Sequence, residues 1–187
     1  MGNETDPKPA RQICRMNVTF HILSAVGASA VLSSTAKDPG PGHSTPLRHW
    51  PLLAAAFVTG VLLHGLLDWI PHSYPINSVA DVSVSLILLI VVMIFVQPKH
   101  RFLFGACAFG VLAPDLVDLG PALVNKRLGW SLPVFKFFPW HWRQYSGSIY
   151  DGSHRMESLL LHSAVVGVSL GLTYLYRDRL FRQIRPT

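Results

Sequence analysis

Charged residues are scarce in this chain. Its 187 residues include 16 Lys and Arg and 10 Asp and Glu, so that 14% of the chain is charged whereas 50% is hydrophobic. Soluble domains carry about 25% charged residues, and disordered chains carry few apolar ones. The composition therefore excludes a disordered chain and disfavours a water-soluble globule, because so much apolar surface needs a non-aqueous environment.

Cysteine is nearly absent. Cys14 and Cys107 are the only two, which excludes a disulfide framework and a metal site of the CxxC type. The formal charge is +6, but the basic residues lie between the apolar runs and do not form a basic face or an aromatic-rich RNA-binding motif. We therefore predict a membrane surface as the anionic partner, and no nucleic acid.

Long apolar runs are what the chain has in abundance. A helix needs about 20 apolar residues to cross a bilayer. Four segments have nearly that length and a fifth is shorter, namely residues 51–70, 79–96, 102–119, 156–176 and, as the shorter one, 18–32. The pattern predicts an all-α integral membrane protein, a helical bundle of about five transmembrane helices with the lipid bilayer as its partner.

The remaining segments do not divide the chain into domains. We predict a single membrane domain over residues 1–187, with an N-terminal tail (1–16), a helical bundle (17–176) containing a long aromatic loop (122–155), and a basic C-terminal tail (177–187). The first run has a second interpretation, because basic residues precede it and Ala28-Ser29-Ala30 is typical of a signal-peptide cleavage site. Lysine and arginine are evenly divided between the two sides, so neither orientation nor oligomeric state is predicted.

Ionisable side chains inside the apolar runs or next to their ends gather at one face of the predicted bundle. Such residues cost about 2.5 kcal/mol or more at membrane depth, so their positions are informative. They fall at the starts of the first, third and fifth spans and at the ends of the second and fourth, and these ends lie on one side of a membrane. They are His21, His64, Asp68, His72, Asp81, Asp115, Asp118, His154, Glu157 and His162.

Sequence spacing places several of these side chains on shared helix faces. His64, Asp68 and His72 lie at i, i+4 and i+8, which puts them on one stripe of a helix. Asp115 and Asp118 lie at i and i+3 and also share a face. The spans can therefore present imidazoles and carboxylates to one another.

The last span carries a similar stripe, because His154 and His162 are eight residues apart. Imidazole nitrogen with carboxylate oxygen is the ligand set of zinc, manganese and iron(II), and helical bundles hold such ions with inward-facing side chains. We predict a divalent metal, zinc first with manganese or iron as alternatives, and metal-assisted hydrolysis. Glu157 or an unliganded aspartate would be the base, and Arg155 would hold an anionic substrate. The predicted ligands are His21, His64, Asp68, His72, Asp115, Asp118, His154 and His162.

These residues also have structural interpretations. A His64–Asp68 pair could hold helices together, and Asp81 could cap the helix that it begins. The rival function is a carrier of protons or metal ions, and a third alternative is a structural membrane protein. The aromatic run 137–143, to which we assign His141, is typical of an interfacial belt. Its alternative interpretation is a lid that guides a lipid-like substrate to the polar face.

These motifs resemble those of small bacterial inner-membrane proteins described as membrane-bound metal-dependent hydrolases. The matching elements are His21 at the opening of a helix, the HxxxD segment 64–68, the Pro-Asp motif with its second acid at 114–118, and His154-Arg155 with His162-Ser163. The resemblance implies a helical hydrolase of the bacterial inner membrane with a bound divalent metal. It leaves the substrate undefined, and we expect a phosphoester or a lipid-linked compound.

Overall fold

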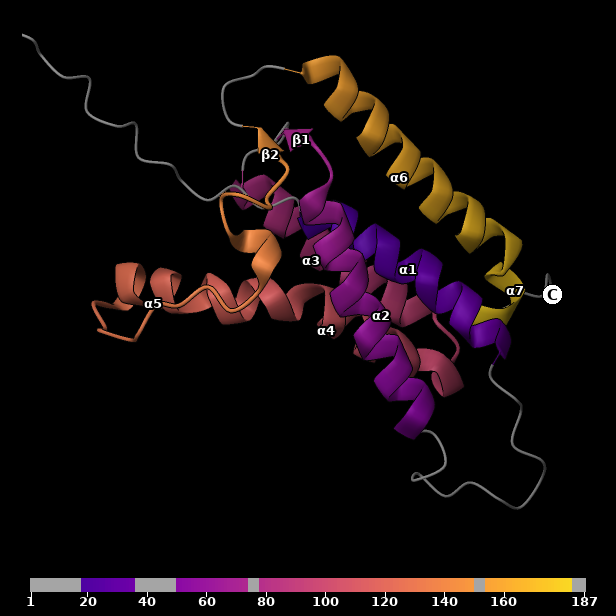
Figure 1. Ribbon diagram of the computed structural model, residues 1–187. Coiled ribbons are helices and arrows are strands. Elements are labelled where there is room, and N and C mark those ends of the chain that lie inside the picture. The colour runs from indigo at the N-terminus through magenta and orange to yellow at the C-terminus, as the bar shows by residue number, and fades with distance from the viewer. Residues whose placement is uncertain (1–17, 36–49, 74–77, 150–153, 183–187) are drawn as a thin grey trace, which may run out of the picture.

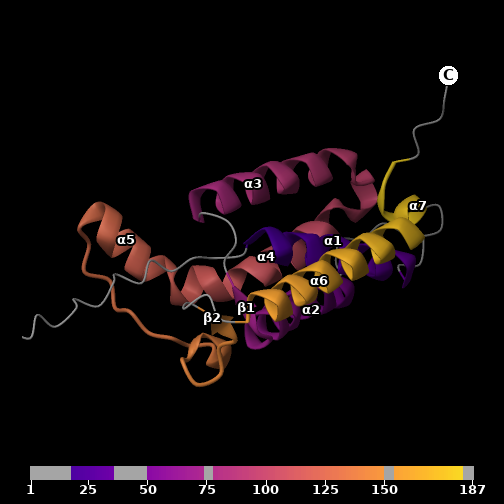
Figure 2. The ribbon, with the colours of Figure 1, turned by 90° about the horizontal axis from the view of Figure 1, so that it is seen from above.

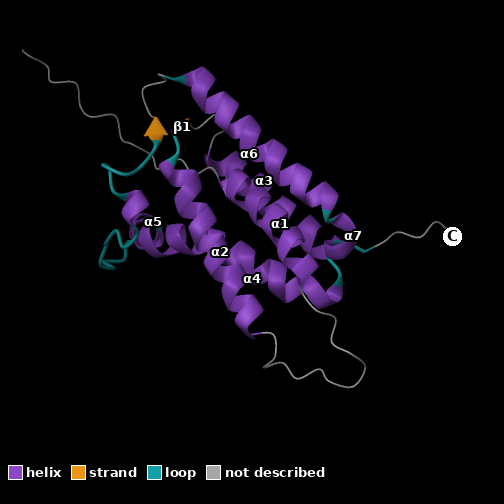
Figure 3. Cartoon of the chain, turned by 45° about the vertical axis from the view of Figure 1, so that its right-hand side comes forward, coloured by secondary structure: helices purple, strands orange, loops and turns teal. Residues whose placement is uncertain are grey.

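The computed structural model describes residues 18–35, 50–73, 78–149 and 154–182 of the chain. Helices dominate these residues (Figures 1 and 3). The longer helices are α1 (Val18–Thr35), α2 (Trp50–Trp69), α3 (Ser78–Phe95), α4 (Arg101–Asp118), α5 (Gly120–Leu128) and α6 (Arg155–Leu175). The short elements are β1 (His72–Ser73), η2 (Pro98–His100), η3 (Pro139–His141), β2 (Ser148–Ile149) and α7 (Arg177–Leu180).

The predicted all-α membrane bundle is confirmed. Within the described residues, five helical segments are long and apolar enough to cross a membrane: Val18–Thr35, Trp50–Trp69, Ser78–Phe95, Pro98–Asp118 and Arg155–Leu175. Large apolar side chains on α3 and α6 point away from the protein, as Ile87 and Leu160 do with 62% and 66% of their surface exposed. In a bilayer this surface faces lipid and needs no further cover.

Helix α1 is the centre of the bundle. It packs against α2, α3, α4 and α6, and Figure 2 shows it lying between α3 and α6. Small side chains such as Ala25 and Ala30 are fully buried along it, and Gly27 lies so close to Ser169 of α6 that a β-carbon would stand 3.0 Å from its carbonyl oxygen. Removing this segment as a signal peptide would therefore take away the helix on which the others pack.

The long loop predicted after the fourth span contains a helix that the sequence did not indicate. Helix α5 follows α4 almost directly, with Pro121 in its first turn, and points away from the bundle in Figure 1. It ends at Gly129, whose φ of 69° lies in the left-handed region that glycine tolerates. With only nine residues and polar side chains in its last turn, α5 lacks the apolar periodicity from which a helix is predicted.

The basic C-terminal tail is also partly structured. Its first residues form α7, whose Leu180 is fully buried. The side-chain amide of Gln97 donates hydrogen bonds to the carbonyls of Asp178, Arg179 and Phe181 at 3.1, 3.0 and 2.9 Å. These contacts attach the end of α6 to the turn between α3 and α4.

Candidate metal centre

Helices α2 and α4 bring together three ionisable side chains. His64 and Asp68 lie one turn apart on α2, and Asp115 lies on α4. The two helices can approach closely because Gly60 and Gly110 face one another, so that a β-carbon on either would overlap backbone atoms of the opposite helix. Glycine at both positions is therefore what allows the three side chains to meet.

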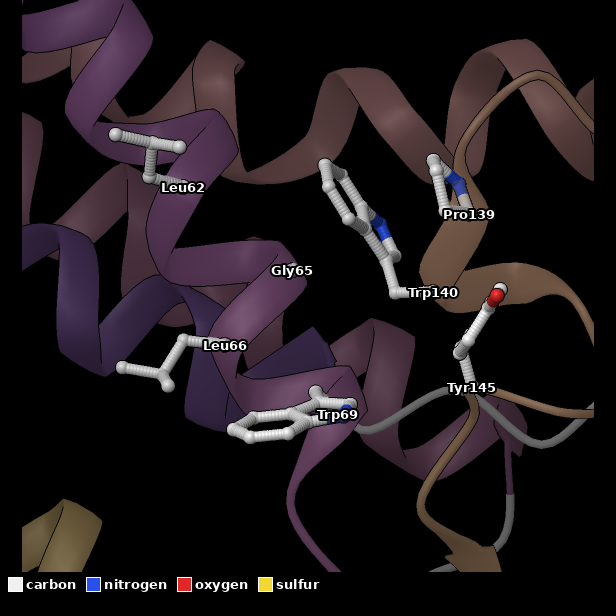
Figure 4. Close-up of a pocket in the computed structure, with 7 residues that line it drawn as sticks. All are labelled: Leu62, Gly65, Leu66, Trp69, Pro139, Trp140 and Tyr145. Atoms are coloured by element: carbon white, nitrogen blue, oxygen red, sulfur yellow. The ribbon is translucent and has the colours of Figure 1, made fainter.

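A fourth side chain comes from the part of the aromatic loop that follows α5, residues 129–149. Its short helix η3 carries His141, which is 9% exposed. Trp140 packs on α2 at Gly65, where a β-carbon would lie 2.7 Å from the indole ring, and Figure 4 shows its side chain extending from the loop toward that helix. Further along, Gly147 N–H donates to the carbonyl of Asp68 at 2.8 Å. The loop is thus docked on the end of α2 with His141 facing inward.

The four side chains converge at metal-binding spacing. One ligand atom from each of His64, Asp68, Asp115 and His141 lies within 4.8 Å of the other three. His64 Nε2 and His141 Nε2 are 3.1 Å apart. Asp68 Oδ2 lies 3.3 and 3.2 Å from these nitrogens, and Asp115 Oδ1 lies 3.9 and 3.4 Å from them. Bond lengths of about 2.0–2.1 Å around a tetrahedral zinc ion require ligand atoms about 3.3 Å apart, so the measured separations fit one ion.

The proton positions on the two rings favour a cation between them. His64 Nδ1–H donates to the carbonyl of Val111 at 2.7 Å, and His141 Nδ1–H donates to Asp118 Oδ2 at 2.7 Å. In each neutral ring the other nitrogen, Nε2, then carries a lone pair. Two lone pairs facing each other across 3.1 Å in a buried site repel, so a metal ion or a proton belongs between them. The donor set therefore fits a divalent metal.

Asp118 supports His141 from behind. It is 1% exposed, and its two oxygens accept hydrogen bonds from the backbone N–H groups of Phe137 and Phe138 at 2.8 and 3.0 Å. Burial alone would lower the pKa of His141, but its contacts with Asp68 and Asp118 raise it above its usual value. Asp118, predicted from sequence as a ligand, lies outside the group of four and contacts it through His141, as in carboxylate–histidine–metal arrangements.

His21 lies against the group on its α1 side. Its ring stacks on that of His64 with centroids 4.2 Å apart, and its Nε2 lies 3.4 Å from Asp68 Oδ1. The residue is 4% exposed, and among the described residues its Nδ1 has no hydrogen-bond partner. Asp68 thus offers one oxygen to the group of four and the other to His21.

Asp81 has a different role from the one expected in either interpretation of the sequence. Its carboxylate accepts hydrogen bonds from the N–H groups of Val18 and Thr19 at 2.7 and 3.2 Å, and from the Thr19 hydroxyl at 2.6 Å. It therefore caps the start of α1, a neighbouring helix, instead of the helix on which it lies. These bonds account for a carboxylate that is fully buried.

His72 and His162 border the group without joining it. With His21 and Asp68 they line a cavity of about 20 Å³, which is room for about one water molecule. His72 Nδ1–H donates to the carbonyl of Ile70 at 2.8 Å, and burial lowers the pKa of His72 against the opposing effects of that bond and of Asp68. A water molecule in this cavity would lie beside Asp68 on the side of the bundle where α6 packs.

The start of α6 holds the remaining predicted residues. His154 and Glu157 form a pair with Nδ1 and Oε2 3.1 Å apart, and their side chains are 65% and 53% exposed. Arg155 is also exposed. None of the three belongs to the group of four in the described structure, so their predicted roles in metal binding and catalysis stay predictions.

His141 is the member of the group that the sequence did not single out. It lies 77 residues from His64 and 23 from Asp118, so no helical spacing connects it to either. Because aromatic residues flank His141 on both sides, the sequence around it indicates an interfacial belt. Its one available cue was that the loop starts and ends on the polar face.

Comparison of the chain with protein-family models, with curated proteins and with solved structures gives no match. The fold and the site by themselves define the class, a helical membrane protein with five candidate spans in the described residues and a buried His/Asp group that could hold a metal ion. The resemblance to metal-dependent membrane hydrolases stays a prediction from short motifs.

Proposed function

We propose that the protein is a membrane-embedded, metal-dependent hydrolase whose ion is held by His64, Asp68, Asp115 and His141. The observation that carries this proposal is the pair of imidazole Nε2 atoms 3.1 Å apart with both Nδ1 hydrogens already engaged. Two carboxylate oxygens complete a four-atom set of tetrahedral size. Two nitrogens and two oxygens in this arrangement favour zinc, since manganese prefers oxygen-rich octahedral sites and iron(II) hydrolytic or redox sites keep more open positions.

Residues beside the group of four can hold the attacking water and accept its proton. A divalent ion held by these four atoms would have to expand to five-coordination, as catalytic zinc does in transition states, to take up water or substrate. In that state it would supply Lewis acidity and lower the pKa of the bound water. The cavity beside Asp68 has room for about one water molecule, and the Asp68–His21 pair can accept its proton. In hydrolysis the hydroxyl part of the water joins the phosphorus or acyl carbon of the substrate. The bond to the leaving oxygen breaks, and that oxygen takes the proton back from the pair.

Metal analysis of purified protein tests the ligand set. Protein never exposed to chelator is expected to retain about one equivalent of divalent metal per chain, measured by plasma mass spectrometry. His141→Ala and Asp115→Asn are expected to lose it, because each removes one of four ligands. The matched control is His154→Ala, which removes an exposed histidine outside the group and is expected to retain the metal.

Two outcomes would contradict the proposal. Loss of metal in His154→Ala with retention in His141→Ala would return the site to the ligands predicted from sequence on α6. Wild-type protein that binds no divalent metal at all would favour a shared proton between the imidazoles, and with it a structural or proton-carrying role.

A further inference from the structure

An apolar groove runs from the lipid-facing surface to the candidate metal centre. It encloses about 220 Å³ between α1, α3, α4 and the start of α5. Its walls include Ile22 of α1, Leu86 of α3, Leu116 of α4 and Leu123 of α5, and they also include Asp115. The lining of this hydrocarbon-rich space therefore includes a member of the group of four.

Helix α3 is attached to the bundle at both ends. At its start, Asp81 caps α1 and Ser85 hydrogen bonds with Thr19 at 3.0 Å. At its other end Val92 is buried in the core, and Val96 just beyond pairs with Phe181. The groove lies along the first half of α3, which contributes Val82, Ser85, Leu86 and Leu89 to its lining.

The groove is continuous with the surface that faces the bilayer. Leu86 and Leu116 line it and are also 55% and 57% exposed, so their side chains form both its wall and part of the lipid-facing surface. Apart from Asp115 and the hydrogen-bonded Ser85, its lining is apolar, which offers water too few partners to stay. Bilayer hydrocarbon is what surrounds this opening in a membrane-spanning bundle.

We propose that the groove binds a hydrocarbon chain of a membrane lipid and that the substrate is therefore an amphiphile that enters sideways from the bilayer. The chain lies against α1, α3 and α4, and the polar group to be hydrolysed lies at Asp115. This inference rests on the proposed hydrolase function and adds the class of substrate. The volume suits a stretch of one chain, since it is smaller than the pockets of about 300–1,000 Å³ that hold compact drug-sized ligands.

Photo-crosslinking in liposomes tests the groove directly. The probe is a phosphatidylcholine with a diazirine in the middle of one acyl chain, and peptides of α4 and α5 are examined by mass spectrometry. Leu86→Trp places a larger ring in the groove and is expected to reduce crosslinks to the region of Leu116 and Leu123 by about threefold or more. Ile87→Trp is the control, since Ile87 is 62% exposed on the same helix and does not line the groove.

Metal content separates failure of this inference from failure of the proposed function. Both variants are expected to keep the metal, because neither residue belongs to the group of four. If Leu86→Trp and Ile87→Trp hold metal and give equal crosslinking at α4 and α5, the groove is not a lipid site, although the hydrolase proposal stands. If Leu86→Trp does not fold, Leu123→Trp blocks the groove from α5, and unchanged crosslinking in that variant overturns the inference. Wild-type protein without metal refutes the hydrolase proposal whatever the crosslinks show.

Discussion

Replacing Asp118 by asparagine changes one atom and disturbs the proton on His141. The carboxylate accepts three hydrogen bonds, from His141 Nδ1–H and Phe138 N–H on Oδ2 and from Phe137 N–H on Oδ1. An amide offers one acceptor atom, so its NH₂ group must face donors on one side. If it replaces Oδ2, His141 can relieve the clash only by carrying its proton on Nε2, the atom that faces the metal. If the NH₂ group replaces Oδ1, it faces the N–H of Phe137. The neutral amide oxygen is then a weaker acceptor for His141 Nδ1–H than the carboxylate.

Either orientation weakens metal binding. Changes in the groups that hold a ligating histidine cost about 10–100-fold in metal affinity, which is about 1.4–2.7 kcal/mol. The structure places Asp118 in this category because it is 2.7 Å from His141 Nδ1 and lies outside the group of four. We therefore expect Asp118→Asn to bind metal about 10–100-fold more weakly than the wild type while keeping all four ligands.

The measurement is a competition titration against a chromogenic chelator in detergent, together with thermal denaturation. Asp81→Asn is the matched control, because this fully buried carboxylate also accepts backbone hydrogen bonds but at the start of α1. It is expected to lower stability by about 1–3 kcal/mol, because the amide NH₂ group faces a backbone N–H at the start of α1 and leaves it unpaired, and to leave metal affinity unchanged. Wild-type affinity in Asp118→Asn would refute the role assigned to His141.

Three further predictions concern packing, the aromatic loop and pH. Gly110→Ala is expected to lower the stability by about 1–3 kcal/mol because its β-carbon overlaps the backbone of α2. Gly171→Ala, where the space is open, is the control in the same thermal denaturation. Trp140→Ala is expected to weaken metal binding in the chelator assay by loosening His141, whereas Trp130→Ala, at a residue 58% exposed, is expected to have no effect. Lowering the pH from about 7 to about 5 is expected to release metal in equilibrium dialysis, because protons compete for the histidine nitrogens; retention at pH 5 would contradict ligation by histidine.

The transmembrane helices and three of the four residues of the group follow from local properties of the sequence. A helix in a bilayer needs a long apolar run, and run length is visible without knowledge of the fold. Alternation of the spans then places His64, Asp68 and Asp115 on one face, and the structure brings these three together. Spacing within α2 places His64 and Asp68 on the same helix face, because the two residues lie at i and i+4.

The fourth residue of the group depends on long-range packing that no local pattern encodes. His141 reaches the group because Trp140 and Gly147 dock the aromatic loop on α2. The start of α6 stands on the predicted face, but α6 packs chiefly on α1 and lies on the outer side of it in Figure 1. The polar residues at the start of α6 thus lie on the same side of the bundle as the group of four but outside it. His154 and Glu157 among them are exposed.

The charges in the centre favour a divalent cation over a shared proton. Asp68, Asp115 and Asp118 place three carboxylates around two imidazoles inside the bundle. With neutral rings the ionised carboxylates carry a charge of −3, of which backbone N–H groups stabilise the charge on Asp118. A shared proton leaves −2 and a divalent ion leaves −1. Because each unbalanced charge at membrane depth costs about 2.5 kcal/mol or more, the folded bundle itself is expected to gain stability from the metal.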